Sequence, residues 1–228
     1  MILQNINEFG EISEKYTARS QVLSNEISKN LDTFVKRFPD FKKDFEIYVI
    51  HSLGEMDGGT RTIGNKEVFI FGVDNIVKLH NGSNDTPFFH HELFHLYYAQ
   101  FSTNDKKIYS SLWEEGLATF LSEELNPGSS VADLMLDIPE GLKHNCDKNL
   151  QFLFKTLSTR LNSGLDKDYE SFFLLSSQNL TIPRRAGYYL GYLIAKEIRK
   201  HFSLDQMIHF SNERALKQIK FALDALTK

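Results

Sequence analysis

The stretch His91-Glu92-Leu93-Phe94-His95 has the spacing H-E-x-x-H. On a helix, residues four apart lie on the same face about one turn apart, so both imidazoles can meet one metal ion. A neutral imidazole is a good zinc ligand, with a Zn–N distance of about 2.0–2.1 Å. Glu92 lies between them on the helix and can reach a metal-bound water as a general base. The stretch therefore predicts a helix with two metal ligands and a catalytic carboxylate.

The residues before this stretch mark the start of its helix. Residues 81–85 read Asn-Gly-Ser-Asn-Asp, which predicts a loop. Thr86 is the expected N-cap, and Pro87 suits the first helical position. From there the pattern is helical to the end of the sequence. Further helices are expected near 110–125, 138–160, 184–201 and 212–227.

The first third of the sequence predicts one helix and a small sheet. Apolar residues over 20–38 form one helical stripe, and Pro39 ends it. Strands are expected over 45–50 and 68–73, with a glycine-rich turn region between them. The order of helix, small sheet and many helices favours an α+β domain over alternating βαβ units. We expect one domain over 1–228, with residues 1–85 forming the helix and sheet and 86–228 the helical part that carries the metal site.

A third metal ligand is expected from the segment Trp113–Phe120. A catalytic zinc ion usually takes three protein ligands and leaves one position open for water. Glu115 follows His95 by 20 residues, which leaves room for a second helix to return beside the first. Glu114 competes with it, because neighbouring residues of a helix point about 100° apart and only one can face the metal. Gly116 is expected to let this second helix approach the metal-bearing helix closely.

Together these motifs resemble the gluzincin metallopeptidases, the thermolysin-like and aminopeptidase-N-like enzymes. Their third ligand is the Glu of a segment of the type N-E-G-F-A-T-Y. When this segment is aligned with residues 114–120 here, its Glu falls on Glu115. The spacing to it is one residue longer than is usual in the aminopeptidase branch. The metzincin pattern needs Gly and His where this sequence has Tyr98 and Phe101. The resemblance covers residues 86–198 and implies a zincin-like fold, one Zn²⁺ ion and a peptide or protein substrate.

A later segment supports the resemblance. In aminopeptidase-N-like enzymes a Tyr three residues before a Gly donates a hydrogen bond to the developing oxyanion, and Tyr188 stands three before Gly191. The resemblance therefore implies that Tyr188 has this role, with Tyr189, Tyr192 and Arg185 as alternatives. The sequence is also similar to a group of uncharacterised bacterial proteins predicted to be zinc-dependent proteases, which share a G-Y-x-x-G-Y segment.

One feature of the aminopeptidase branch is missing. Its G-A-M-E-N segment supplies a Glu for the substrate amine, but residues 57–64 read Asp-Gly-Gly-Thr-Arg-Thr-Ile-Gly. This difference argues against aminopeptidase activity. The glycine-rich stretch and the strand over 68–73 are candidates for a sheet edge on which an extended peptide pairs; an ordinary hairpin turn is the alternative. The remaining histidines, His80 among them, have no ligand spacing and are expected to be surface or packed residues.

The composition excludes several other classes of protein. A net charge of −4 and the lack of a dense Lys/Arg stripe argue against nucleic-acid binding, and one cysteine excludes an internal disulfide. No apolar run of about 18 residues predicts a membrane span. A cytoplasmic location is expected if Met1 is the true start, and export if a signal was removed.

The favoured function is a zinc peptidase; the alternatives are a zinc hydrolase with a non-peptide substrate and an inactive metal-containing binding protein. The oligomeric state is not predicted.

Overall fold

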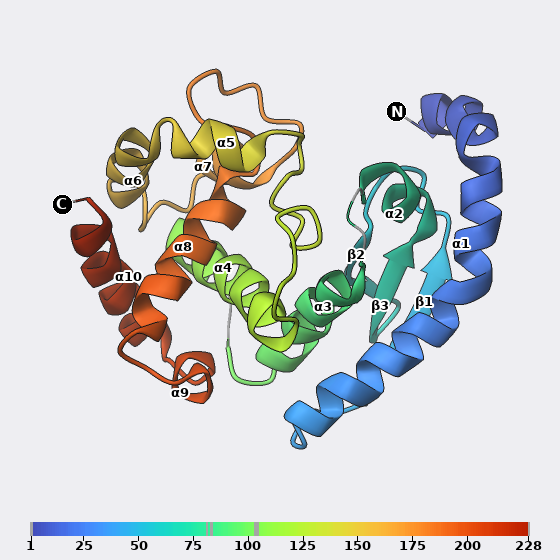
Figure 1. Cartoon of the computed structure of the whole chain (residues 1–228), viewed down its shortest axis with the longest axis horizontal. Coiled ribbons are helices and arrows are strands. Elements are labelled where there is room, and N and C mark those ends of the chain that lie inside the picture. Colours follow the sequence, from blue (N-terminus) through green and yellow to red (C-terminus); the bar gives the residue numbers. More distant parts are fainter. Residues whose placement is uncertain (1, 81, 83, 103–104, 228) are drawn as a thin grey trace.

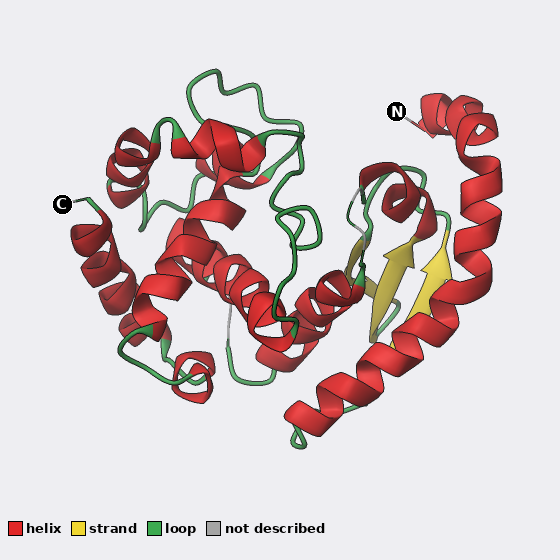
Figure 2. Cartoon of the chain, in the orientation of Figure 1, coloured by secondary structure: helices red, strands yellow, loops and turns green. Residues whose placement is uncertain are grey.

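The computed structural model describes residues 2–80, 82, 84–102 and 105–227. It is mostly helical with one small three-stranded sheet, which confirms the α+β class (Figures 1 and 2). In Figure 1 the sheet, α1 and α2 form one half, α5 to α10 form the other, and α3 and α4 lie between them. In chain order the elements are α1 (Ile2–Arg37), β1 (Glu46–Ile50), β2 (Gly58–Ile63), β3 (Lys66–Gly72), α2 (Val73–Leu79), α3 (Thr86–Tyr98), α4 (Ile108–Leu125), α5 (Leu142–Asp147), α6 (Leu150–Ser158), α7 (Asp166–Phe173), α8 (Ala186–Arg199), α9 (Leu204–Ile208) and α10 (Asn212–Leu226).

Helix α1 is much longer than the helix expected over 20–38. The added turns carry Phe9 and Tyr16, whose rings lie 5.2 Å apart and each 5.4 Å from the ring of His51. These aromatic contacts give the polar first half of the helix a tertiary partner, which its sequence does not reveal. Further along, Leu23 packs on the sheet and Phe34 on the helical half. Helix α1 therefore spans both halves of the molecule.

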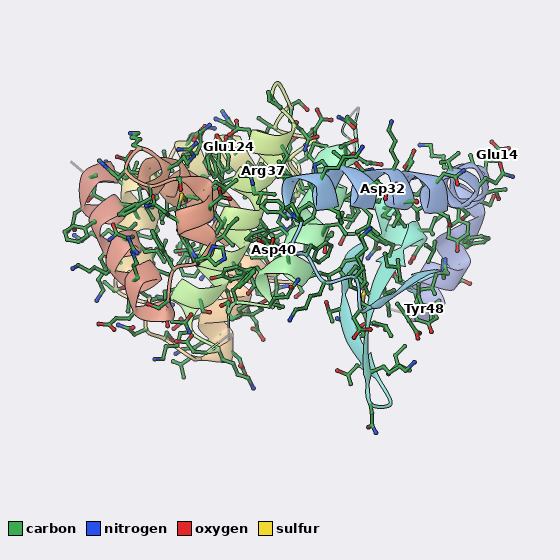
Figure 3. The ribbon with its side chains drawn as sticks, turned by 90° about the horizontal axis from the view of Figure 1, so that it is seen from below. Glu14, Asp32, Arg37, Asp40, Tyr48 and Glu124 are labelled. Atoms are coloured by element: carbon green, nitrogen blue, oxygen red, sulfur yellow. The ribbon has the colours of Figure 1, made fainter. Side chains whose placement is uncertain are left out.

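The far end of α1 is fastened to the helical half by polar contacts. Arg37 forms an ion pair of 3.1 Å with Asp205 of α9, and the Tyr97 hydroxyl donates to Asp40 at 3.0 Å. Figure 3 shows Arg37 and Asp40 where the two halves meet, while Glu14 and Asp32 lie further along α1. No helix within the described ranges is long and apolar enough to cross a membrane.

The sheet has the strand order β1-β3-β2, with β1 parallel and β2 antiparallel to β3. The expected strands over 45–50 and 68–73 are confirmed as β1 and β3, although Val73 already begins α2. The expectation that the strand over 68–73 forms a sheet edge is wrong, because β3 is central. One edge is β1, and the other is β2, which forms in the glycine-rich stretch for which a sheet edge and a hairpin turn were the alternatives. Its sequence, Gly-Gly-Thr-Arg-Thr-Ile, lacks the apolar alternation that identifies strands, so β3 holds it mainly by backbone hydrogen bonds.

Helix α3 begins at Thr86, one residue earlier than an N-cap at Thr86 requires, so the expected N-cap is wrong. Asp85 occupies the N-cap position, with Pro87 in the first turn. The Asp85 carboxylate does not cap the helix; it accepts a hydrogen bond of 2.6 Å from Arg19 and lies 3.2 Å from His80 Nδ1. These two partners draw the side chain away from the backbone N–H groups and fix the start of α3 to α1 and to the residue after α2.

The helices expected near 110–125, 184–201 and 212–227 are confirmed as α4, α8 and α10. The single helix expected over 138–160 is wrong, since α5 and α6 are separate helices. Asn149 lies between them with a φ of −132°, which is not helical. The short helices α2, α7 and α9 were not expected, because each has too few residues to show a helical repeat.

Helices α4 and α8 cross at their closest point through two glycines. A Cβ on Gly116 would lie 2.2 Å from the Gly191 carbonyl carbon, and one on Gly191 would lie 2.5 Å from the Leu112 carbonyl oxygen. The expectation that Gly116 faces the metal-bearing helix is therefore wrong. Gly116 is the contact to α8 on the opposite side of α4, because a helix turns about 100° between Glu115 and its neighbour.

We expect Gly116→Ala to lower the free energy of unfolding by about 1–3 kcal/mol, because the added methyl group meets rigid backbone. Urea denaturation measures the change. The control is Gly10→Ala in α1, where a Cβ has nothing within 4 Å and the alanine favours the helix. Equal stability of Gly116→Ala and the wild type would show that this crossing is not as close as described.

Candidate metal centre

Three donor atoms from α3 and α4 converge at the crossing of these helices. His91 and His95 lie one turn apart on α3, and their Nε2 atoms are 3.0 Å apart. One carboxylate oxygen of Glu115, from α4, lies 3.2 Å from His91 Nε2 and 3.4 Å from His95 Nε2. Among the residues that the structure describes, these three side chains form the group that can hold a metal ion.

The spacing of these atoms fits a small tetrahedral ion. Four donors placed tetrahedrally at about 2.0–2.1 Å from a zinc ion lie about 3.3–3.4 Å from one another. The observed separations of 3.0, 3.2 and 3.4 Å are close to the edges of such a tetrahedron. The donor set of two imidazoles and one carboxylate also suits zinc and leaves the fourth corner open.

Two further side chains fix the orientation of the imidazoles. Glu114, the competing candidate, lies 3.2 Å from His95 Nδ1 and not beside the Nε2 atoms. Thr119 donates its hydroxyl proton to the Glu115 carbonyl at 2.8 Å, so its lone pairs face His91 Nδ1 at 3.5 Å. Both contacts favour the tautomers protonated at Nδ1, which direct the Nε2 lone pairs toward the three-donor group.

Glu92 reaches the same space from α3 and lies against the sheet edge. A Cβ on Gly58 would come within 2.7 Å of the Glu92 carboxyl carbon, so the missing side chain makes room for this carboxylate. Burial is the main reason that the pKa of Glu92 is raised to about 8. A carboxylate with a pKa near neutrality accepts protons readily, as a general base must.

Burial and the attraction between opposite charges shift the pKa values of the three donors in opposite directions. Burial lowers the pKa of His91. Burial would also lower the pKa of His95, but the negative charges of Glu115 and Glu114 outweigh it and raise this pKa well above its usual value. Burial would raise the pKa of Glu115. The positive charge of His95 and the hydrogen bonds to His91 and His95 outweigh this effect and lower the pKa of Glu115. The cluster therefore favours a Glu115 carboxylate beside a cationic His95 and a neutral His91.

Of the four candidates for oxyanion stabilisation, Tyr188 and Arg185 lie beside the donors. The ring of Tyr188 stacks near that of His91, with centroids 6.4 Å apart, and burial raises its pKa well above its usual value. Tyr189 donates to Asp147 at 2.6 Å, and the Tyr192 hydroxyl accepts from Lys196 at 2.8 Å. These two hydroxyls therefore have other partners and do not line the cavity at the metal centre.

A cavity of about 280 Å³ opens at the three donors. One wall is the start of β2, and the others come from α3, α4 and the start of α8. Its polar lining residues are Asp57, Thr60, His91, Glu92, His95, Glu114, Glu115, Thr119, Arg185 and Tyr188. Its apolar lining comes from Phe69, Phe88, Leu134 and Met135, with Gly58 and Gly59 adding bare backbone. The cavity thus combines the polar donor group with an apolar part of its lining.

The sequence analysis missed a buried charge network beside this cavity. His80, expected to be an ordinary histidine, is only 4% exposed and lies 3.3 Å from Asp57 and 3.2 Å from Asp85. Burial would lower the pKa of His80, but hydrogen bonds to both carboxylates raise it. His80 therefore joins the cavity wall before β2 to the start of α3. No spacing in the sequence signals this contact, because its members are 23 and 5 residues apart.

No protein-family model, curated protein or solved structure matches this chain. The geometry of the site is therefore the basis for any function assigned to the chain.

We expect the purified chain to bind about one zinc ion and His91→Ala, His95→Ala and Glu115→Ala each to lose most of that affinity. Glu114→Gln removes only the partner of His95 Nδ1, so it should weaken binding by about 10–100-fold. Zinc competition titrations measure these affinities, and His209→Ala, an exposed histidine, is the control. If Glu115→Ala binds zinc normally and Glu114→Gln does not, Glu114 is the ligand.

Proposed function

We propose that this chain is a zinc-dependent peptidase of the gluzincin type, with a zincin-like fold. The observation that carries the proposal is the convergence of His91, His95 and Glu115, with Glu92 beside them in the same cavity. When bound, zinc supplies a Lewis acid that polarises a carbonyl group and makes water more acidic. The three ligands leave one position open for these reactants.

Glu92 acts as the general base in this proposal. Its raised pKa and its place at the cavity wall suit it to accept a proton from the attacking water and to deliver it to the leaving amine. Gly58 keeps this carboxylate at the wall without a steric conflict. The cavity thereby has one group that can move the proton in both steps of peptide hydrolysis.

Tyr188 stabilises the oxyanion. Burial raises the pKa of its phenol, so the hydroxyl keeps its proton and remains a donor. A preorganised donor aimed at a developing oxyanion contributes about 2.7–4 kcal/mol of barrier reduction in other hydrolases. Arg185, stacked on the same ring, keeps Tyr188 from turning away, with 4.2 Å between the guanidinium carbon and the ring centroid.

A peptide is the preferred substrate class because of the sheet edge at the cavity. Gly58, Gly59 and Thr60 of β2 line the cavity, and β2 pairs with β3 on its other side only. The hairpin joining β2 and β3 projects from the body of the molecule in Figure 3. An extended peptide can add to such an edge by backbone hydrogen bonds and pass across the three donors.

Two alternatives belong to other substrate or function classes. A zinc hydrolase with a non-peptide substrate would use the same four residues, but the strand edge beside the cavity favours a peptide. An inactive binding protein with a structural zinc ion would normally have a fourth protein ligand. The donor group among the described residues has three, which favours a catalytic site. A digest of a broad peptide library distinguishes these functions, since only a peptidase releases new amino termini.

Glu92→Gln should keep zinc but lower peptide turnover by about 10²–10⁴-fold, because glutamine cannot accept the proton. Peptide hydrolysis and zinc content are measured on the same preparation. The matched control is Glu197→Gln on α8, which changes an acidic side chain that does not line the cavity. Full activity in Glu92→Gln would remove Glu92 from the mechanism.

Gly58→Ala should also lower turnover, through a purely steric effect. The new methyl group meets the end of the flexible Glu92 side chain, which must move away from the cavity wall. We expect a loss of about 10–100-fold with unchanged zinc affinity, comparable to other small misplacements of catalytic groups. The control is Gly164→Ala, where the nearest atom to a Cβ lies at 3.5 Å. Unchanged turnover in Gly58→Ala would show that Glu92 does not act from this position.

A further inference from the structure

Two consecutive arginines precede α8 and have different surroundings. Arg184 donates through Nε to the Ser177 carbonyl at 3.0 Å and is exposed. Arg185 adopts the left-handed conformation with a φ of 61° and a ψ of 17°, and its side chain lines the cavity at the metal centre. A left-handed conformation is strained for a non-glycine residue, and such residues are concentrated at functional sites. This backbone conformation is what brings Arg185 to the cavity.

The guanidinium of Arg185 has no hydrogen bond or ion pair with any of the residues that the structure describes. Its recorded contact is with an aromatic face, since the guanidinium carbon lies 4.2 Å from the centroid of the Tyr188 ring. Stacking of this kind uses the face of the guanidinium and leaves the N–H groups at its edge available. The side chain is therefore held in place while its donors remain open.

Asp57, an acidic group near Arg185, is already engaged by other partners. Asp57 is close enough for the charge of Arg185 to help lower its pKa. One oxygen of Asp57 accepts the Gly58 N–H at 3.0 Å, and the other lies 3.3 Å from His80 Nε2. The charge network around His80 thus satisfies Asp57 and leaves Arg185 without a protein carboxylate of its own.

We propose that Arg185 binds a carboxylate of the substrate, beside the bond that is cleaved. A guanidinium edge presents paired N–H donors that match a carboxylate. The ligand chemistry is a carboxylate group, supplied either by the C-terminus of a peptide or by an acidic side chain. The apolar lining of the cavity, from Phe69, Phe88, Leu134 and Met135, suits an apolar group of the same substrate. This inference rests on the proposed peptidase function and specifies its substrate class.

The test compares ligands that differ only in a carboxylate. N-acetylphenylalanine and its amide test the C-terminal source, and the α-amides of N-acetylglutamate and N-acetylglutamine test the side-chain source. Ligand-observed NMR titration of the purified protein, with equal metal content in every variant, measures the four dissociation constants. We expect at least one acid to bind about tenfold more tightly than its neutral partner. The pair that shows the preference identifies the source.

The variants decide whether Arg185 causes that preference. Arg185→Gln should abolish it, Arg185→Lys should keep part of it, and Arg184→Gln should leave it unchanged. Circular dichroism confirms that each variant is folded. Equal binding or no binding of all acids and amides to the wild type overturns the proposal. A preference that survives in Arg185→Gln also overturns it, because the carboxylate then binds elsewhere, such as at the metal.

Binding and hydrolysis fail separately in this design. If no peptide is cleaved but the preference for the acid depends on Arg185, the proposed peptidase function is wrong and the carboxylate site stands. If peptides are cleaved and Arg185→Gln lowers the turnover of acids and amides equally, without a change in binding, Arg185 serves the oxyanion and the carboxylate site is wrong.

Discussion

The crossing of α3 and α4 is the constraint on which the rest of the structure depends. His91 and His95 are brought together by one helical turn, but Glu115 joins them only because α4 is held at the right height beside α3. Helix α8 supplies this hold from behind through the Gly116–Gly191 contact. Arg185 precedes the same helix and Tyr188 lies in its first turn, so one packing arrangement positions the metal ligands and the cavity wall formed by α8.

The opposite wall depends on a second set of contacts, in which buried charges take the place of apolar packing. Arg19 of α1 binds Asp85, and His80 joins Asp85 to Asp57 at the start of β2. Isolated buried charges are costly, but a chain of paired charges fixes the groups that it connects. The distance between Gly58 on β2 and Glu92 on α3 is thereby determined by side chains that never reach the cavity centre.

The sequence predicted those parts of the site that follow from a local repeat. The i, i+4 spacing of His91 and His95 and the amphipathic pattern of α8 need only helical geometry, and α3, α4 and α8 are where helices were expected. Strand β2 shows no strand pattern in the sequence, because its residues are small or polar and its stability comes from backbone pairing with β3. The contacts of His80 with Asp57 and Asp85 were not predicted for a related reason. The tertiary fold brings these residues together, and no spacing in the sequence indicates it.

The charge balance of the site gives an independent reason to expect a cation there. Glu92, Glu114 and Glu115 line one cavity together with two imidazoles and the guanidinium of Arg185. The separation of 3.0 Å between the Nε2 atoms leaves room for one shared proton, because two protonated nitrogens would repel each other at that distance. A divalent ion can bind both nitrogens and the Glu115 carboxylate at once, which no single proton can do. The polar partners of the outer nitrogens, Glu114 and Thr119, favour the ring orientation that such an ion requires.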